Sequence, residues 1–153
     1  MNEESLRKSN HNLRVRFGLV VVILGLLVFT LGTEPALFNL DRSPVVGFVQ
    51  ISVFLVGLAM ICLGGFITLN TLWIGKEKTI AADIGYRLVS TGYVIAFASG
   101  MADVIGFGSQ PFPAVPYFGP FQASGVILGE IVIIVGFFLM IPYPNRTHKP
   151  PAE

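Results

Sequence analysis

The chain has 153 residues, of which 53% are hydrophobic and only 12% are charged. A soluble domain carries about 25% charged residues, so this composition excludes an ordinary water-soluble fold. Ten basic and nine acidic residues leave a formal net charge of +1, which gives no reason to expect a nucleic-acid partner. We therefore predict an integral membrane protein whose apolar side chains face lipid.

Four apolar segments are long enough to cross a hydrocarbon layer of about 30 Å as helices. They lie between two tails, residues 1–16 and 143–153, and together form a transmembrane domain over residues 17–142. The fold class that follows is all-α, an antiparallel up-down four-helix bundle in the membrane. The predicted spans are residues 17–33, 45–73, 87–107 and 121–141.

Prolines and capping residues set several of these boundaries. Ser43 and Pro44 form a helix start before the second span. Residues 79–86 predict a separate interfacial turn of helix ahead of the third span. Pro120 and Pro142 bracket the fourth span, because proline is tolerated in the first turn of a helix and disrupts its interior.

The basic residues predict the orientation. Nine of the ten lysines and arginines lie in the tails or between the second and third spans, and only Arg42 lies on the other side. The positive-inside rule places the basic segments in the cytoplasm. We therefore predict a plasma-membrane protein with both its N- and C-termini cytoplasmic, and with Trp73 at the depth of the cytoplasmic interface.

Cysteine and histidine usage limits redox and metal chemistry. Cys62 is the only cysteine and lies within an apolar run, so an intrachain disulfide is impossible. His11 and His148 lie in the tails. With no other thiol or imidazole near Cys62, we expect no metal site and no cofactor.

Small residues recur at seven-residue steps in the predicted helices. Such a step keeps them on one helix face, and small side chains let helix backbones approach closely in lipid. We expect a tightly packed bundle, with Gly125 and Gly129 as an alternative surface for self-association or docking to a larger complex. The helix-packing residues are Gly18, Gly25, Gly32, Gly57, Gly64, Gly92, Ser99, Gly125, Gly129 and Gly136.

Glu130 lies near the middle of the fourth span, where no basic residue is predicted at the same depth. A charged side chain there costs about 2.5–3.5 kcal/mol, so an unpaired carboxyl should take up a proton and is a functional candidate. Its role stays open between a proton or ion site, a polar clamp at a subunit interface, an acceptor for a ligand hydroxyl or amine, and a structural hydrogen bond.

Asp103 lies near the outer end of the third span, on the side of the small-residue stripe. Gln50 and Gln122 are expected at a similar depth, and Arg42 is the single outer cation. We predict that these residues form a polar layer that fastens the outer ends of the helices. A substrate or ion site at Asp103 is the alternative.

Residues 106–120 contain four prolines, three glycines and four aromatic residues. Proline restricts the backbone, and aromatic side chains favour the headgroup interface or a partner surface. The segment is therefore predicted to be a lid folded over the bundle, a docking patch, or a cover for a lipophilic ligand.

Three functions are compatible with these features. The chain carries no P-loop, G-x-S-x-G, H-E-x-x-H or Rossmann pattern, so no catalytic residues can be named and a non-enzymatic function is favoured. The first hypothesis is an accessory, assembly or scaffold component that contacts membrane lipids and forms a homo-oligomer or docks to a larger membrane complex. The alternatives are a small proton- or ion-linked transporter or channel using Glu130 and Asp103, and a binder or enzyme for a lipid or quinone under residues 106–120.

Overall fold

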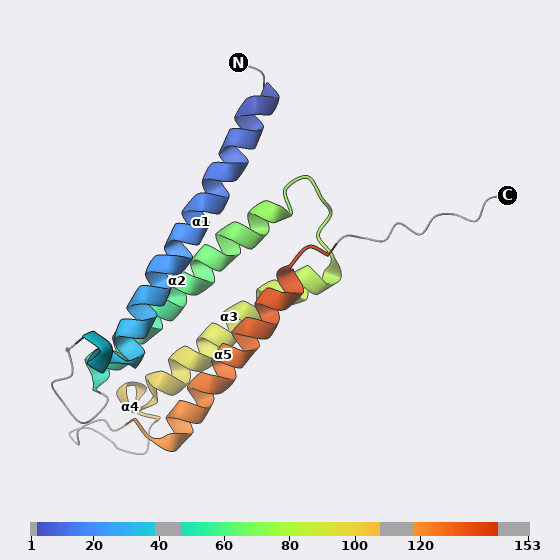
Figure 1. The fold of residues 1–153 in the computed structure, drawn as a ribbon. Coiled ribbons are helices and arrows are strands. Elements are labelled where there is room, and N and C mark those ends of the chain that lie inside the picture. The colour runs from blue at the N-terminus through green and yellow to red at the C-terminus, as the bar shows by residue number, and fades with distance from the viewer. Residues whose placement is uncertain (1–2, 39–46, 108–117, 144–153) are drawn as a thin grey trace.

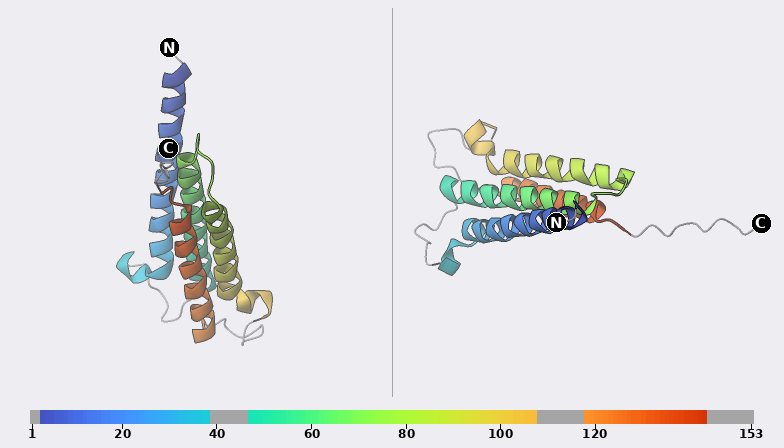
Figure 2. Two further views of the ribbon diagram at one scale, coloured as in Figure 1. Left: turned by 90° about the vertical axis from the view of Figure 1, so that its right-hand side faces the viewer. Right: turned by 90° about the horizontal axis from the view of Figure 1, so that it is seen from above.

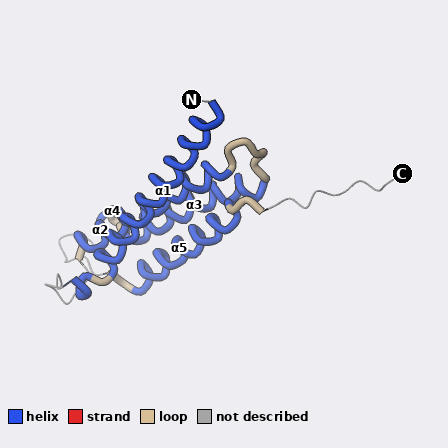
Figure 3. The backbone as a smooth tube through the Cα atoms, turned by 45° about the horizontal axis from the view of Figure 1, so that its top comes forward, coloured by secondary structure: helices blue, strands red, loops and turns tan. Residues whose placement is uncertain are grey.

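The computed structural model describes residues 3–38, 47–107 and 118–143. Within these ranges every regular element is a helix, as Figures 1 and 3 show. Three helices, lying in α1, α2 and α5, are long and apolar enough to cross a membrane. The prediction of an all-helical membrane protein is confirmed at this level.

Helix α1, Glu3–Thr33, ends where the first span was predicted to end but begins far earlier. The predicted tail, residues 1–16, is therefore largely helical in its described part. A short 3-10 helix, η1 at Pro35–Phe38, follows α1.

Helix α2, Phe48–Leu72, starts after Gly47 and is followed by Trp73 as its C-terminal cap. It begins three positions later than the predicted span, and the predicted start at Ser43 and Pro44 lies outside the described residues. Its other end agrees with the prediction to within one residue.

Helix α3, Ile80–Gly100, corrects the prediction of a separate interfacial turn before the third span. The Thr79 hydroxyl accepts a hydrogen bond of 3.2 Å from the Ala82 backbone nitrogen and so caps the helix. Asp83 and Arg87 then form an ion pair of 3.1 Å across one turn. Because no proline lies within residues 80–100, the two predicted pieces form one helix. α3 is not among the three helices apolar enough to span a membrane.

A short helix, α4 at Ala102–Ile105, follows α3 after a break at Met101, where the prediction had a continuous span to residue 107. Gly106 ends α4 with a φ of 86°, a conformation that glycine adopts without steric cost. Helix α5, Pro120–Met140, closes the described fold and agrees with the fourth predicted span to within one residue at each end.

Helices α1 and α2 form a close-packed pair along their apolar lengths (Figure 1). A Cβ atom on Gly25 would lie 2.8 Å from the Ile61 backbone nitrogen, so a larger residue does not fit there. The two helices run in opposite directions, because the contacts join Gly18 to Gly64, Gly25 to Gly57 with Ile61, and Gly32 to Phe54.

Helices α3 and α5 form a second close-packed pair by the same means. A Cβ atom on Gly92 would lie 2.6 Å from the Gly129 carbonyl oxygen. Backbone-to-backbone approach of this kind is the usual role of small residues between helices in lipid. The order is again antiparallel, with Gly85 against Gly136, Gly92 against Gly129, and Ser99 against Gly125.

The two pairs meet through larger side chains. The buried core between them contains Leu58, Cys62, Val89, Ala96, Ile133 and Met140. The Trp73 indole nitrogen donates a buried hydrogen bond of 2.8 Å to the Met140 carbonyl oxygen. We call the end of the molecule that contains this hydrogen bond the Trp73 end. The opposite end, where α5 begins, is called the Phe118 end.

Helix α1 lies at the edge of this arrangement (Figure 2). It packs along α2 but not along α5, whereas α2 also contacts α3 and α5. A closed four-helix arrangement would place a second neighbour against α1. The described residues therefore form two close-packed pairs with an open seam between α1 and α5.

Candidate functional site

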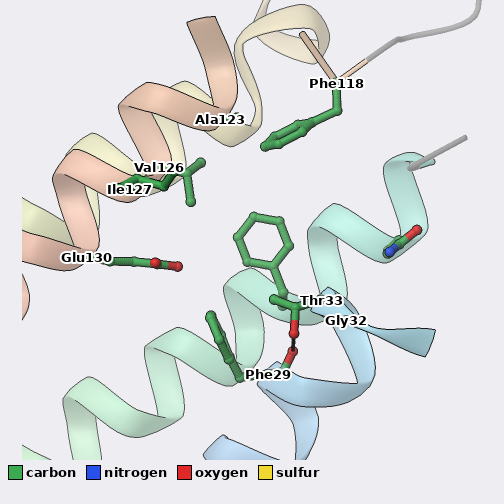
Figure 4. Close-up of a pocket in the computed structure, with 10 residues that line it drawn as sticks. Phe29, Gly32, Thr33, Phe118, Ala123, Val126, Ile127 and Glu130 are labelled. Atoms are coloured by element: carbon green, nitrogen blue, oxygen red, sulfur yellow. Dashed lines mark hydrogen bonds between the residues drawn. The ribbon is translucent and has the colours of Figure 1, made fainter. Parts of the chain in front are cut away.

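The open seam contains a cavity of about 410 Å³ near the Phe118 end. Helix α2 forms its floor, and α1 and α5 form its two sides (Figure 4). We call it the seam cavity. It is lined by Phe29, Gly32, Thr33, Gln50, Phe54, Phe118, Ala123, Val126, Ile127 and Glu130.

Three phenylalanines give the seam cavity its aromatic character. Phe29 and Phe54 pack edge to face, with ring centroids 6.1 Å apart and an interplanar angle of 84°. This is a favoured geometry for aromatic pairs. The Phe118 ring reaches in from the segment before α5, on the side opposite Phe29 (Figure 4). The cavity is therefore formed by aromatic rings from three separate parts of the chain.

Glu130 extends from the middle of α5 into this cavity (Figure 4). The spacing of Ala123, Val126, Ile127 and Glu130 places all four on one helix face, and all four line the cavity. The carboxyl is half-buried and has no hydrogen-bond or salt-bridge partner among the described residues. Of the roles considered from the sequence, this position favours contact with a ligand over a structural hydrogen bond.

Two further polar residues line the seam cavity. The Thr33 hydroxyl donates a hydrogen bond of 3.1 Å to the Phe29 carbonyl oxygen within α1. Gln50, predicted to belong to an outer polar layer, instead lines the cavity from the first turn of α2. Polar groups are thus few and lie at separate points on an apolar wall, as is typical of small-molecule sites.

Asp103 does not belong to this site. It lies on α4, is only 7% exposed, and its Oδ1 atom has no hydrogen-bond partner among the described residues. It does not line the seam cavity. The prediction that Glu130 and Asp103 act together therefore receives no support from their placement.

Asp103, Gln50 and Gln122, the predicted members of a polar layer, make no hydrogen bond to one another among the described residues. The Gln122 side chain accepts a hydrogen bond of 2.8 Å from the Gly119 backbone nitrogen and caps α5. It lines a different cavity, with Ser99 and Phe121. Arg42, the fourth predicted member, lies outside the described residues.

The predicted docking surface of Gly125 and Gly129 is occupied within the chain. A Cβ atom on Gly129 would lie 2.6 Å from the Ala96 backbone nitrogen of α3. Gly125 lies against Ser99 of the same helix. These two residues therefore hold α5 to α3 and leave no stripe for another molecule on that face.

Two features of the site had little or no sequence signal. The open seam depends on which helices become neighbours, and Phe29 and Phe54 look like ordinary apolar residues of their spans. Phe118 belongs to the aromatic segment predicted as a cover for a lipophilic ligand, and it does line the cavity. Residues 108–117 of that segment lie outside the described residues.

Clusters of ligands for metal ions are absent from residues 3–38, 47–107 and 118–143, where no three His, Cys, Asp or Glu side chains come together. Comparison with known proteins gives no match to a family model, to a curated protein or to a solved structure. The fold and composition define the chain as an all-helical membrane protein, and the seam cavity is its candidate functional site.

Proposed function

We propose that the chain is a non-enzymatic membrane protein that binds a lipophilic small molecule in the seam cavity. The observation that carries this proposal is a cavity of about 410 Å³ with three aromatic rings and a single carboxyl group on its wall. This volume lies within the range of small-molecule sites, about 300–1,000 Å³. The Phe118 contribution also supports the hypothesis of a lipophilic ligand next to residues 106–120.

The membrane environment determines which interactions give such a site its selectivity. A ligand that moves from lipid tails into an apolar cavity gains little from the hydrophobic effect, because both surroundings are apolar. Selectivity must then come from ring packing and from the polar group at Glu130. The cavity should therefore prefer amphipathic molecules over plain hydrocarbons.

Filling the cavity tests this function. Ala123→Phe places a ring in the space between α1 and α5 and should abolish crosslinking of an alkyl-diazirine lipid probe to the cavity residues Val126 and Glu130. Ala98→Phe is the matched control, because Ala98 is exposed on α3 and does not line the cavity. Equal crosslinking of cavity residues in wild-type protein and in Ala123→Phe would contradict the proposal.

We further propose that α3 crosses the membrane with the other three helices and that both termini are cytoplasmic in the plasma membrane. The basic asymmetry of the sequence supports this topology. In a Cys62→Ala background, cysteines at Ser9 and Lys76 should react with an impermeant thiol reagent only from the cytoplasmic side. A cysteine at Phe107 should react only from outside, and the reverse pattern would contradict the topology.

The other two hypotheses have less structural support. An accessory or scaffold role through Gly125 and Gly129 is weakened because these residues already pack against α3. A transport role that joins Glu130 to Asp103 is weakened because only Glu130 lines the seam cavity. Association through another surface, with a second copy or a larger complex, remains compatible with ligand binding.

A further inference from the structure

The described wall of the seam cavity contains one charged residue type. Among the described residues that line the cavity, Glu130 is the only acidic or basic one, and α1 and α2 supply aromatic, aliphatic and uncharged polar groups. Tyr93 of α3 does not line the cavity, and its hydroxyl donates a hydrogen bond of 3.5 Å to the Leu55 carbonyl oxygen. When Glu130 is ionised, the cavity therefore carries one negative charge.

No described cation is placed to balance that charge. The nearest basic residues along α1 are Arg14 and Arg16, and Arg16 precedes Phe29 by thirteen positions, about 20 Å of helix. Lys76, Lys78 and Arg87 lie toward the Trp73 end, away from the cavity. A carboxylate in an apolar site needs a partner, because an isolated buried charge is costly.

The aromatic wall adds to the same preference. The faces of phenyl rings carry negative potential and attract cations. Phe29, Phe54 and Phe118 all line the cavity that Glu130 enters. The carboxyl and the rings therefore both favour a positively charged group on the ligand.

We propose that the molecule held in the seam cavity is a lipophilic cation, with its positive group beside Glu130 and its apolar part between α1 and α5. This inference rests on the proposed function and specifies its ligand class. A neutral alcohol of the same shape could donate a hydrogen bond but would leave the carboxylate charge unbalanced. A phospholipid phosphate would be repelled.

Two photoreactive probes with the same diazirine-labelled alkyl chain test the ligand class. One carries a trimethylammonium head, which is permanently charged, and the other carries a hydroxyl head. In phosphatidylcholine vesicles, the ammonium probe should label residues 123–130 and 29–33 at least about tenfold more strongly than the hydroxyl probe. Labelling by the ammonium probe should also be stronger at pH 8 than at pH 5. The charge of the trimethylammonium head does not change with pH, whereas the Glu130 carboxyl carries its negative charge more fully at pH 8.

Substitutions assign the effect to one residue. Glu130→Gln should reduce ammonium labelling to the level of the hydroxyl probe, and Glu130→Asp should restore part of it. Glu34→Gln is the control, because Glu34 is an exposed carboxylate just beyond Thr33 and outside the cavity lining. It should leave the labelling by both probes unchanged.

The outcomes separate this inference from the proposed function. Equal labelling of the cavity by both probes, unaffected by Glu130→Gln, would overturn the cation inference while supporting a lipophilic site. Stronger ammonium labelling at pH 5 than at pH 8 would also overturn it. Failure of both probes to label cavity residues in wild-type protein would contradict the inference and the proposed function together.

Discussion

The contacts within the two helix pairs differ in kind from the contacts between them. Within a pair, backbones meet at glycines, so that an added Cβ atom on Gly25 or Gly92 would lie within 3 Å of the partner helix backbone. Between the pairs, side chains such as Phe66 and Phe137 make the contact, with their ring centroids 6.2 Å apart. On the α1 side the pairs leave a cavity of about 410 Å³.

This difference separates rigid parts of the molecule from adjustable ones. A backbone contact through glycine has no rotamer to change, so it tolerates no added volume. A contact between long side chains can shift by rotation at a smaller cost. The two pairs should therefore behave as rigid units, and the interface between them should accommodate substitutions and ligands.

The largest expected effect comes from adding bulk within a pair. In Gly129→Leu the Cβ atom alone would lie 2.5 Å from the Gly92 carbonyl oxygen and 2.6 Å from the Ala96 nitrogen. We expect a loss of about 3 kcal/mol or more in the free energy of unfolding, at or above the upper end for overpacking, measured by titration with a denaturing detergent.

Ile131→Leu is the control for this substitution, because Ile131 is 51% exposed on another face of α5. It should change the free energy of unfolding by less than about 0.5 kcal/mol. Equal stability of the two variants would show that the pairs are not held by close backbone contact.

Trp73→Phe should have the next largest effect, on the interface between the pairs. It removes the indole donor and leaves the buried Met140 carbonyl oxygen without its 2.8 Å hydrogen bond. We expect a loss of about 1–3 kcal/mol in the free energy of unfolding. Tyr93→Phe removes a longer hydrogen bond, of 3.5 Å, and should cost less. A larger loss for Tyr93→Phe would contradict this ranking.

Gly65→Ala tests whether the interface between pairs is adjustable. The added Cβ atom would lie 2.5 Å from the edge of the Phe137 ring, which is a side chain and not backbone. The ring can move, so we expect a loss of about 1 kcal/mol or less in thermal unfolding experiments. Gly92→Ala, which adds the same methyl group against the α5 backbone, should lose clearly more. Equal losses would remove the distinction between the two kinds of contact.

Glu130→Gln should have the smallest effect on stability. The carboxyl faces the seam cavity and has no partner among the described residues, so its neutral isostere leaves no group unpaired. We expect a change below about 0.5 kcal/mol in the free energy of unfolding. A loss of 2 kcal/mol or more would indicate a structural hydrogen bond at Glu130, and the ligand role would then lose its main support.

The sequence predicted those parts of the fold that depend on one helix at a time. The end of α2 was predicted from Trp73 as an interfacial residue and the start of α5 from Pro120, and both positions agree with the prediction to within one residue. The seven-residue stripes indicated which faces approach a neighbour. The prediction divided α3 into an interfacial turn and a separate span, because the polar residues near Asp83 and Arg87 indicated the membrane–water interface. The same two residues form an ion pair that stabilises one continuous helix.

The sequence could not predict features that depend on several helices together. Which pairs form, and which seam stays open, depends on packing between stripes that look alike in sequence. Depth in the membrane alone does not place Gln50, Gln122 and Asp103 on facing surfaces, and no hydrogen bond joins them among the described residues. Glu130 was identified because a charged side chain is costly within the membrane. Its aromatic surroundings could not be predicted, because they come from the neighbouring helices.

The modest hydropathy of α3 has a consequence for biogenesis in the proposed four-span topology. Asp83 and Arg87 lie in its first two turns, and charged residues weaken the entry of a helix into the bilayer on its own. The glycine surface that matches α3 belongs to α5, which the ribosome makes later. We expect α3 to wait beside the translocon until α5 emerges, so that the protein enters the bilayer as two successive hairpins and not as four single helices.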